Sequence, residues 1–201
     1  LGGKVFFCNS GAEANEGLIK LARKWGAEQG RHEIITMRNS FHGRTLATLT
    51  ATGQEKVQKG FAPLPPGFVY ADFNDLESVK ARTTDRTAAV LLEPLQAEGG
   101  VVPAEREFMR GLEHWCRERG MLLLVDEVQT GMGRTGICFG YKHYDIVPDG
   151  ISLAKALGGG FPIGAVVTGP KLKDVLTAGS HGTTFGGQPL ACAVARTVLR
   201  V

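Results

Sequence analysis

Two apolar segments indicate the architecture of this chain: Leu122-Leu123-Leu124-Val125-Asp126-Glu127-Val128-Gln129 and Ile151-Ser152-Leu153-Ala154-Lys155-Ala156-Leu157-Gly158-Gly159-Gly160. Each has strand character and is followed by one charged group, the carboxylate of Asp126 in the first segment and the amine of Lys155 in the second. Short continuous apolar runs are typical of strands in a sheet that is covered on both faces. In open α/β sheets, ligands bind beyond the carboxyl ends of the strands. We therefore expect Asp126 and Lys155 to face one site.

The same kind of strand pattern recurs along the chain and alternates with helical periodicity. The helical patterns cover Ala12–Trp25 and Glu105–Arg119, and a third starts near Pro189 and runs to the end. This alternation predicts an α/β fold with three layers, α/β/α, around a mostly parallel sheet. The strand patterns are Val5–Cys8, Ile34–Met37, Phe68–Tyr70, Ala88–Leu92, Met121–Asp126, Gly150–Leu153 and Ala165–Thr168.

Composition narrows the class of protein. With 201 residues, of which 43% are hydrophobic, the chain can bury one core, and we expect one domain over residues 1–201. The net charge of +3 is small and dispersed, which argues against a nucleic-acid partner, and no apolar run is long enough to predict a membrane span. The cysteines have neither metal-ligand nor redox spacing, so we expect structural thiols in a reducing, cytoplasmic compartment and no metal site. They are Cys8, Cys116, Cys138 and Cys192.

A lysine and an aspartate at neighbouring strand ends are what a site for pyridoxal 5'-phosphate (PLP) needs. The amine of Lys155 forms the Schiff base, and the carboxylate of Asp126 pairs with the protonated ring nitrogen. Small residues around Lys155, among them Gly158–Gly160, leave room beside the amine. The residues alone also permit a purely structural ion pair between Asp126 and Lys155. A nucleotide hydrolase is disfavoured, because the Gly-Lys pair at Gly3-Lys4 precedes a strand and is not part of a phosphate-binding loop.

The segment Ser10-Gly11-Ala12-Glu13 opens the first predicted helix and has the pattern of a capping box. The N-terminus of a helix favours anions, and the small residues Gly11 and Ala12 let a phosphate approach the backbone. An ordinary helix start without a ligand explains the same four residues.

Further candidates are less specific when taken singly. Phe41 suits stacking on a ring, and Arg44 suits a bidentate clamp on a carboxylate. Glu93 follows a strand, where it is either a site residue or a solvated loop acid. Thr183 and Thr184 offer hydroxyl groups for a phosphate contact.

Together these segments resemble the class III PLP-dependent aminotransferases, and most closely the acetylornithine aminotransferases. The resemblance covers nearly the whole chain and preserves the order of the family's motifs. The matching stretches are Phe7–Asn15, Ser40–Thr45, Leu92–Pro94, Asp126–Gly131, Leu153–Lys155 and Thr184–Gly187.

The resemblance implies a role for each matching position. It makes Lys155 and Asp126 the catalytic residues, with Val128 and Phe41 on the two faces of the cofactor ring and Gln129 near the ring oxygen. Ser10, Gly11 and Ala12 would bind the phosphate, Thr184 the phosphate of a neighbouring subunit, and Glu127 is grouped with these cofactor-binding residues. Arg44, Glu93 and Thr183 would contact the substrate.

The resemblance also implies a fold and a reaction. The chain would be the PLP-binding large domain of a fold-type I transferase, without the N-terminal segment and the C-terminal small domain of the family. The expected enzyme moves the terminal amine of N-acetylornithine to 2-oxoglutarate in arginine biosynthesis, as a homodimer with sites shared between subunits. Ornithine, succinylornithine and 4-aminobutyrate remain alternative donors. A non-catalytic α/β module is a further alternative for the chain.

Overall fold

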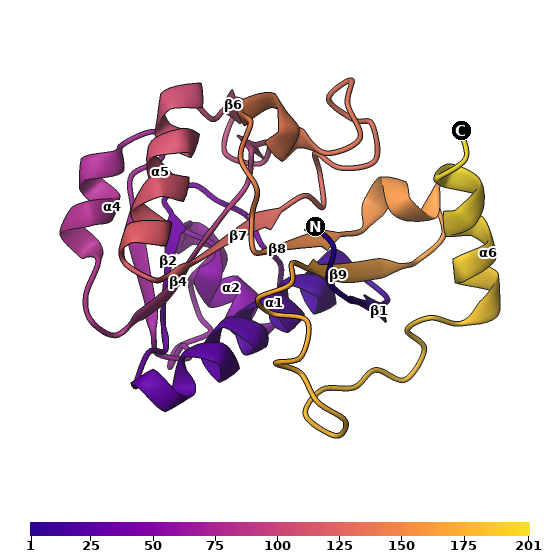
Figure 1. Ribbon diagram of the computed structural model, residues 1–201, viewed down its shortest axis with the longest axis horizontal. Coiled ribbons are helices and arrows are strands. Elements are labelled where there is room, and N and C mark those ends of the chain that lie inside the picture. The colour runs from indigo at the N-terminus through magenta and orange to yellow at the C-terminus, as the bar shows by residue number, and fades with distance from the viewer.

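A seven-stranded sheet forms the centre of the computed structural model, which describes residues 1–201 (Figure 1). Its strand order is β1-β9-β8-β7-β4-β2-β3. Strand β9 runs antiparallel to both of its neighbours, while the other strand pairs are parallel, so the prediction of a mostly parallel sheet is confirmed. The strands are β1 (Val5–Cys8), β2 (Glu33–Met37), β3 (Phe68–Ala71), β4 (Thr87–Leu92), β7 (Leu122–Asp126), β8 (Gly150–Leu153) and β9 (Gly164–Thr168).

Alternate residues of the central strands supply two separate hydrophobic cores, one on each face of the sheet. Leu122 and Leu124 of β7 pack with helix α1 (Gly11–Gly26) in one core. Leu123 and Val125 pack with helix α5 (Arg106–Glu118) in the other core. Because successive side chains of a strand point to opposite faces, α1 and α5 cover opposite sides of the sheet, which confirms the three-layer arrangement. Both faces are covered, so every residue of β2, β4, β7 and β8 is buried and most of these residues are apolar.

The remaining elements are short, and the sequence patterns did not predict them. A helix of four to seven residues shows too little periodicity to be recognised, and a strand of two residues shows none. In α4, the side chain of Asp75 caps the helix by accepting a hydrogen bond from Ser78 N at 3.0 Å. The elements are α2 (Leu46–Ala51), α3 (Glu55–Gln58), α4 (Leu76–Arg82), the pair β5 (Leu95–Gln96) and β6 (Val102–Pro103), and the 3-10 turns η1 (Ala27–Gln29), η2 (Gly140–Tyr144) and η3 (Lys155–Gly158).

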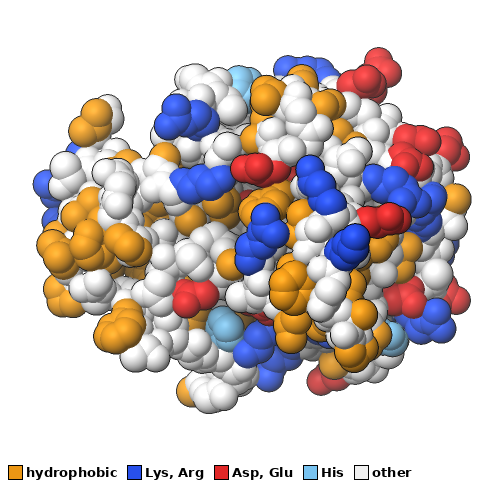
Figure 2. All heavy atoms as spheres, turned by 180° about the vertical axis from the view of Figure 1, so that it is seen from behind, with side chains coloured by type: hydrophobic (Ala, Val, Ile, Leu, Met, Phe, Trp, Pro, Cys, Tyr) orange, Lys and Arg blue, Asp and Glu red, His pale blue; other side chains and the backbone are white.

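Helix α6 (Pro189–Val198) lies at one end of the molecule, beside η3 (Figure 1). Large hydrophobic side chains at this end are exposed, among them Leu190, Leu199 and Val201. The reverse view shows hydrophobic side chains gathered there (Figure 2). No helix of the structure combines the length and the apolar character needed to cross a lipid bilayer.

Candidate functional site

The ends of β7 and β8 bring Asp126 and Lys155 to one cavity. The two strands are neighbours in the sheet, and Asp126 pairs in register with Ser152, three residues before Lys155. The cavity measures about 480 Å³. Its walls come from the ends of several strands and from the first turn of α1, as expected for a ligand site of an α/β sheet. They include Asn9, Ser10, Gly11, Ala12, Asn15, Phe41, His42, Gly43, Arg44, Glu93, Ala97, Glu98, Asp126, Val128, Gln129, Ala154, Lys155 and Gly160–Ile163.

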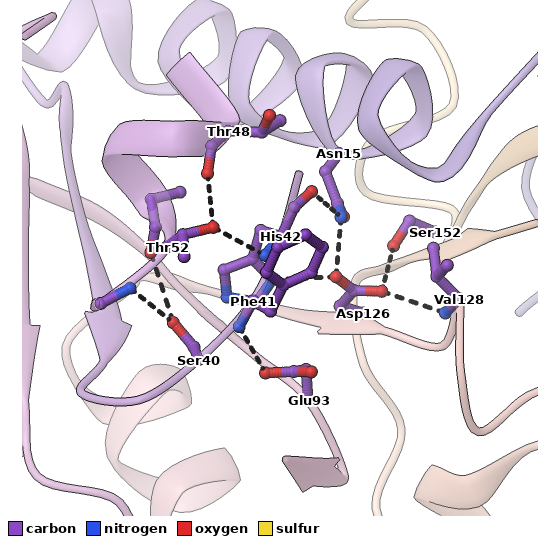
Figure 3. Close-up of polar contacts among 12 residues, drawn as sticks. Asn15, Ser40, Phe41, His42, Thr48, Thr52, Glu93, Asp126, Val128 and Ser152 are labelled. Atoms are coloured by element: carbon purple, nitrogen blue, oxygen red, sulfur yellow. Dashed lines mark hydrogen bonds and ion pairs between the residues drawn. The ribbon is translucent and has the colours of Figure 1, made fainter. Parts of the chain in front are cut away.

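The carboxylate of Asp126 is buried and receives hydrogen bonds from four groups (Figure 3). Its Oδ2 lies 2.7 Å from Asn15 Nδ2 and 2.8 Å from His42 Nδ1. Its Oδ1 accepts from Val128 N at 3.0 Å and from Ser152 Oγ at 3.2 Å. These partners come from α1, from the segment after β2, from the residues after β7 and from β8. Together they fix the plane of the carboxylate and stabilise its negative charge.

His42 is completely buried behind this carboxylate. Burial alone would lower the pKa of the imidazole, but the hydrogen bond and the charge of Asp126 raise it. The backbone N–H of His42 donates to Thr52 Oγ1 at 2.9 Å, which holds the segment after β2 in place. His42 Nε2 has no hydrogen-bond partner.

The amine of Lys155 is not tied to the carboxylate of Asp126. Its Nζ donates to the side-chain oxygen of Gln129, and no ion pair joins Lys155 to Asp126, so the alternative of a structural ion pair between them is wrong. Lys155 opens η3 with a φ of +41°, in the left-handed region. A non-glycine residue held in this region costs about 1–3 kcal/mol, and such residues cluster at functional sites. Lys155 lines the cavity, and the hydrogen-bond partner of its amine is neutral.

The start of α1 forms the opposite wall of the cavity. Ser10 Oγ accepts a hydrogen bond from Glu13 N at 3.2 Å, which confirms the predicted cap. The carboxylate of Glu13 accepts from Asn9 N, at 2.5 Å, and not from Ser10 N as a capping box requires. At Gly11 an added Cβ would lie 2.8 Å from Val128 Cγ1, so glycine lets the Val128 side chain pack against this turn. The first N–H groups of a helix have no partner within the helix, and the first two residues of α1, Gly11 and Ala12, line the cavity.

Phe41, Arg44 and Glu93 line the same cavity. The backbone N–H of Phe41 donates to Glu93 Oε2 at 3.0 Å, and the Arg44 guanidinium lies 5.4 Å from the centre of the Phe41 ring. Glu93 is only 5% exposed, which excludes a solvated loop acid. Burial, helped by the charge of Asp126, raises the pKa of Glu93 to about 7, although His42 and Lys155 oppose the shift.

Glu127 follows Asp126 directly, but its side chain does not line the cavity. Its carboxylate accepts hydrogen bonds from Thr130 Oγ1 at 2.6 Å, Tyr141 N at 2.7 Å and Gly140 N at 2.9 Å. Burial raises the pKa of Glu127, and these hydrogen bonds work against that shift. The Glu127 side chain therefore holds the start of η2, away from the cavity that contains Lys155.

Thr183 and Thr184 also lie outside the cavity of Lys155. They line a separate hollow of about 350 Å³ together with Phe6, His181 and other residues around β1. Thr183 Oγ1 accepts a hydrogen bond from Asn9 Nδ2 at 3.1 Å, and Asn9 lines both hollows. Within one chain, the two threonines are therefore not brought together with Asp126 and Lys155.

Three residues whose side chains hydrogen-bond to Asp126 were not selected from the sequence as site residues: Asn15, His42 and Ser152. Asn15 carried a usable signal, because it is a polar residue on the apolar face of α1, between the buried residues Ala14 and Leu18. His42 and Ser152 carried none beyond their closeness to candidate residues. The structure shows no group of three or more His, Cys, Asp or Glu side chains arranged to hold a metal ion.

Comparison with known proteins gives the family. A family model described as aminotransferase class-III matches residues 2–201. The chain belongs to this family. It is 58% identical over 201 residues to the acetylornithine aminotransferase of Myxococcus xanthus, and 55% identical over 205 residues to the succinylornithine transaminase of Yersinia pseudotuberculosis. Each alignment covers 98% of this chain and 50% of the relative, so the chain spans about half the length of these curated relatives.

Solved structures of the class share the fold. The ornithine aminotransferase of Toxoplasma gondii, whose structure has partial occupancy of PLP at the active site, matches with a TM-score of 0.92 and 38% identity. The match covers 98% of this chain and 49% of that one. This likeness confirms the predicted fold-type I α/β architecture.

Proposed function

We propose that the protein is a PLP-dependent aminotransferase, and that residues 1–201 are its large, cofactor-binding domain. The observation that carries the proposal is that two charged groups lie in one cavity without contacting each other. One is the buried Asp126 carboxylate, fixed by hydrogen bonds from four groups, and the other is the Lys155 amine, which makes no ion pair with that carboxylate. A buried carboxylate needs hydrogen-bond donors in any protein, but a non-catalytic module would require neither an amine without an ion pair beside it nor the strained backbone of Lys155.

The residues present fit PLP. The first turn of α1, with Ser10, Gly11 and Ala12, offers N–H groups to the phosphate. The Asp126 carboxylate suits a protonated ring nitrogen, and Gln129 stands beside Lys155 to meet the ring oxygen. Phe41 and Val128 supply apolar surfaces for the two faces of the ring. The membership of the class-III family supports the same assignment.

When bound, PLP supplies an electron sink for the bonds of the amine-bearing carbon. Lys155 Nζ would hold the cofactor by its aldehyde carbon and, once displaced by a substrate amine, carry a proton between the substrate carbon and the cofactor. Asp126 would hold the proton on the ring nitrogen, and its four partners prevent the carboxylate from turning away. Arg44, which lines the same cavity, would bind a substrate carboxylate. Glu93, with a pKa of about 7, can hold or release a proton at the cavity wall near neutral pH.

The donor we propose is N-acetylornithine or a close relative, and the acceptor is 2-oxoglutarate, in arginine biosynthesis in the cytoplasm. One relative at 58% identity is named for acetylornithine and another at 55% for succinylornithine, so both acylated ornithines are candidates. Ornithine and 4-aminobutyrate are the alternatives. We further propose a homodimer in which Thr184 reaches the phosphate at the neighbouring subunit's site, since Thr184 lies outside the cavity of its own chain.

The test is the absorption spectrum of the protein with PLP. We expect a visible band that bleaches on addition of N-acetylornithine or N-succinylornithine and returns with 2-oxoglutarate. Lys155→Ala is the matched control and should show only the spectrum of free PLP. Comparison of bleaching rates among N-acetylornithine, N-succinylornithine, ornithine and 4-aminobutyrate identifies the donor. If the protein forms no visible band, or if its spectrum with PLP equals that of Lys155→Ala, the proposal is wrong and a binding module is favoured.

A further inference from the structure

Asn15 joins three parts of the site through a single amide group. It lies in α1 and is 1% exposed. One proton of its Nδ2 points to Asp126 Oδ2 at 2.7 Å, and the other points to the main-chain oxygen of His42 at 2.8 Å (Figure 3). Helix α1, the end of β7 and the segment after β2 therefore meet at this one nitrogen.

The oxygen of the same amide has no partner. Asn15 Oδ1 is buried and accepts no hydrogen bond. An unsatisfied buried acceptor destabilises a protein, and each such group in a native structure calls for an explanation. The neighbouring buried positions of α1, Ala14 and Leu18, are apolar, so an apolar residue would pack on this face without that cost. The explanation lies in the two N–H donors, because they are the only polar groups of the side chain that are used.

We propose that Asn15 is a positioning residue that keeps the proton on the ring nitrogen of the bound cofactor. The inference rests on the proposed function, since it assumes PLP in the cavity. A hydrogen bond donated to a carboxylate favours its negative form over its protonated form. With the Asn15 amide on Oδ2, a proton shared between Asp126 and the ring nitrogen therefore stays on the nitrogen.

The second donor extends the effect to the segment after β2. By holding the carbonyl of His42, Asn15 fixes the residue whose Nδ1 lies 2.8 Å from the same Oδ2. The residue before it is Phe41, which is our candidate for one face of the ring. Loss of Asn15 would thus remove one donor from the carboxylate and loosen another, while Ser152 and Val128 on Oδ1 remain.

The experiment is nitrogen NMR of the protein loaded with PLP that carries ¹⁵N in its ring. The ring-nitrogen chemical shift reports protonation at that atom, whatever the activity. Asn15→Leu keeps the approximate volume and removes both donors together with the unpaired oxygen. Asn15→Ala is the second variant, for the case that leucine prevents folding. Ser152→Ala is the comparison variant, because it removes one donor from the same carboxylate at the longer distance of 3.2 Å.

We expect the ring-nitrogen signal of both Asn15 variants to move toward that of unprotonated pyridine, and that of Ser152→Ala to move less. A purely structural role would lower the melting temperature and leave the signal unchanged. An unchanged signal in an Asn15 variant that still forms the visible band with PLP overturns the inference and leaves the proposed function intact. If the unaltered protein forms no visible band, the proposed function fails first, so the two failures are distinguishable.

Discussion

Replacement of Glu93 by glutamine should change how the stability of the protein depends on pH. Glu93 lies at the end of β4, is 5% exposed, and faces Asp126, His42 and Lys155 across the cavity. Burial, together with the charge of Asp126, raises the pKa of Glu93 from 4.5 to about 7. A carboxyl group whose pKa is raised by folding contributes stability below its unfolded pKa. That contribution is lost as the pH rises through the folded pKa.

The size of the effect follows from the shift. At about 1.4 kcal/mol per pKa unit, the rise from 4.5 to about 7 corresponds to about 3 kcal/mol once the pH is well above 7. About 1 kcal/mol of this is already lost at pH 5, because the unfolded chain has begun to ionise. Glutamine is neutral at every pH and can still accept the hydrogen bond from Phe41 N. The free energy of unfolding of Glu93→Gln, relative to that of the unaltered protein, should therefore increase by about 2 kcal/mol between pH 5 and pH 8.

The assay is urea denaturation of both proteins without PLP at the two pH values. The difference in the free energy of unfolding between the proteins is compared at pH 5 and at pH 8, so that the other titrating groups cancel. Glu28→Gln makes the same exchange at an exposed position and serves as the control. A difference between the proteins that is the same at both pH values would refute the assignment of a raised pKa to Glu93.

Three further substitutions test the packing around the site. Ser10→Ala removes the cap of α1 and should lower the free energy of unfolding by about 1 kcal/mol, measured by urea denaturation. Gly11→Ala places a Cβ 2.8 Å from Val128 Cγ1 and should cost about 1–3 kcal/mol in the same assay, and should weaken PLP binding measured by fluorescence. Leu122→Ala opens a cavity in the core under α1 and should cost about 2–5 kcal/mol, seen as a lower melting temperature.

Each of these substitutions has a matched control in the same chain. Ser10→Thr keeps a hydroxyl oxygen at the cap and should retain most of the stability; equal losses in Ser10→Thr and Ser10→Ala would contradict the capping argument. The Cβ of Gly182→Ala meets no neighbouring atom, so this variant should have nearly the same free energy of unfolding as the unaltered protein. Gly11→Ala must lower the free energy of unfolding by more than this control does. Leu190 is 58% exposed, so Leu190→Ala should cost much less than Leu122→Ala, and similar costs would contradict the assignment of the core.

The sequence allowed prediction of the central sheet because its strands are buried on both faces. Each apolar run, such as Ala88–Leu92, lies within one residue of an observed strand, here Thr87–Leu92. The direction of β9 was not predicted, because an apolar run reads the same in either direction. The short helices α2 to α4 were missed, because helices of four to seven residues show too little periodicity to be recognised.

In the site, Asp126 and Lys155 were predictable because strand ends gather at one edge of the sheet. Asn15 and His42 were harder to predict, since their contacts with Asp126 depend on how α1 and the segment after β2 cross the end of β7. Glu127 shows that closeness in sequence to a site residue does not predict where a side chain lies. Adjacent residues at a strand end point in different directions, so closeness in sequence to Asp126 did not place the Glu127 side chain in the cavity.

The antiparallel strand β9 has a consequence for the order in which the chain folds. The turn that carries Lys155 joins β8 directly to β9, so this pair forms with little loss of chain entropy. Strand β1 instead pairs Val5 with Val167, which closes a loop over most of the chain, and non-local pairings of this kind form slowly. The cap at Ser10 follows β1 directly. During synthesis, the lysine and its turn can therefore take shape as soon as β9 is made. The N-terminal end of α1, which we propose as the phosphate site, reaches its place only when β1 docks against that strand, so the proposed site would be complete only once the sheet has closed.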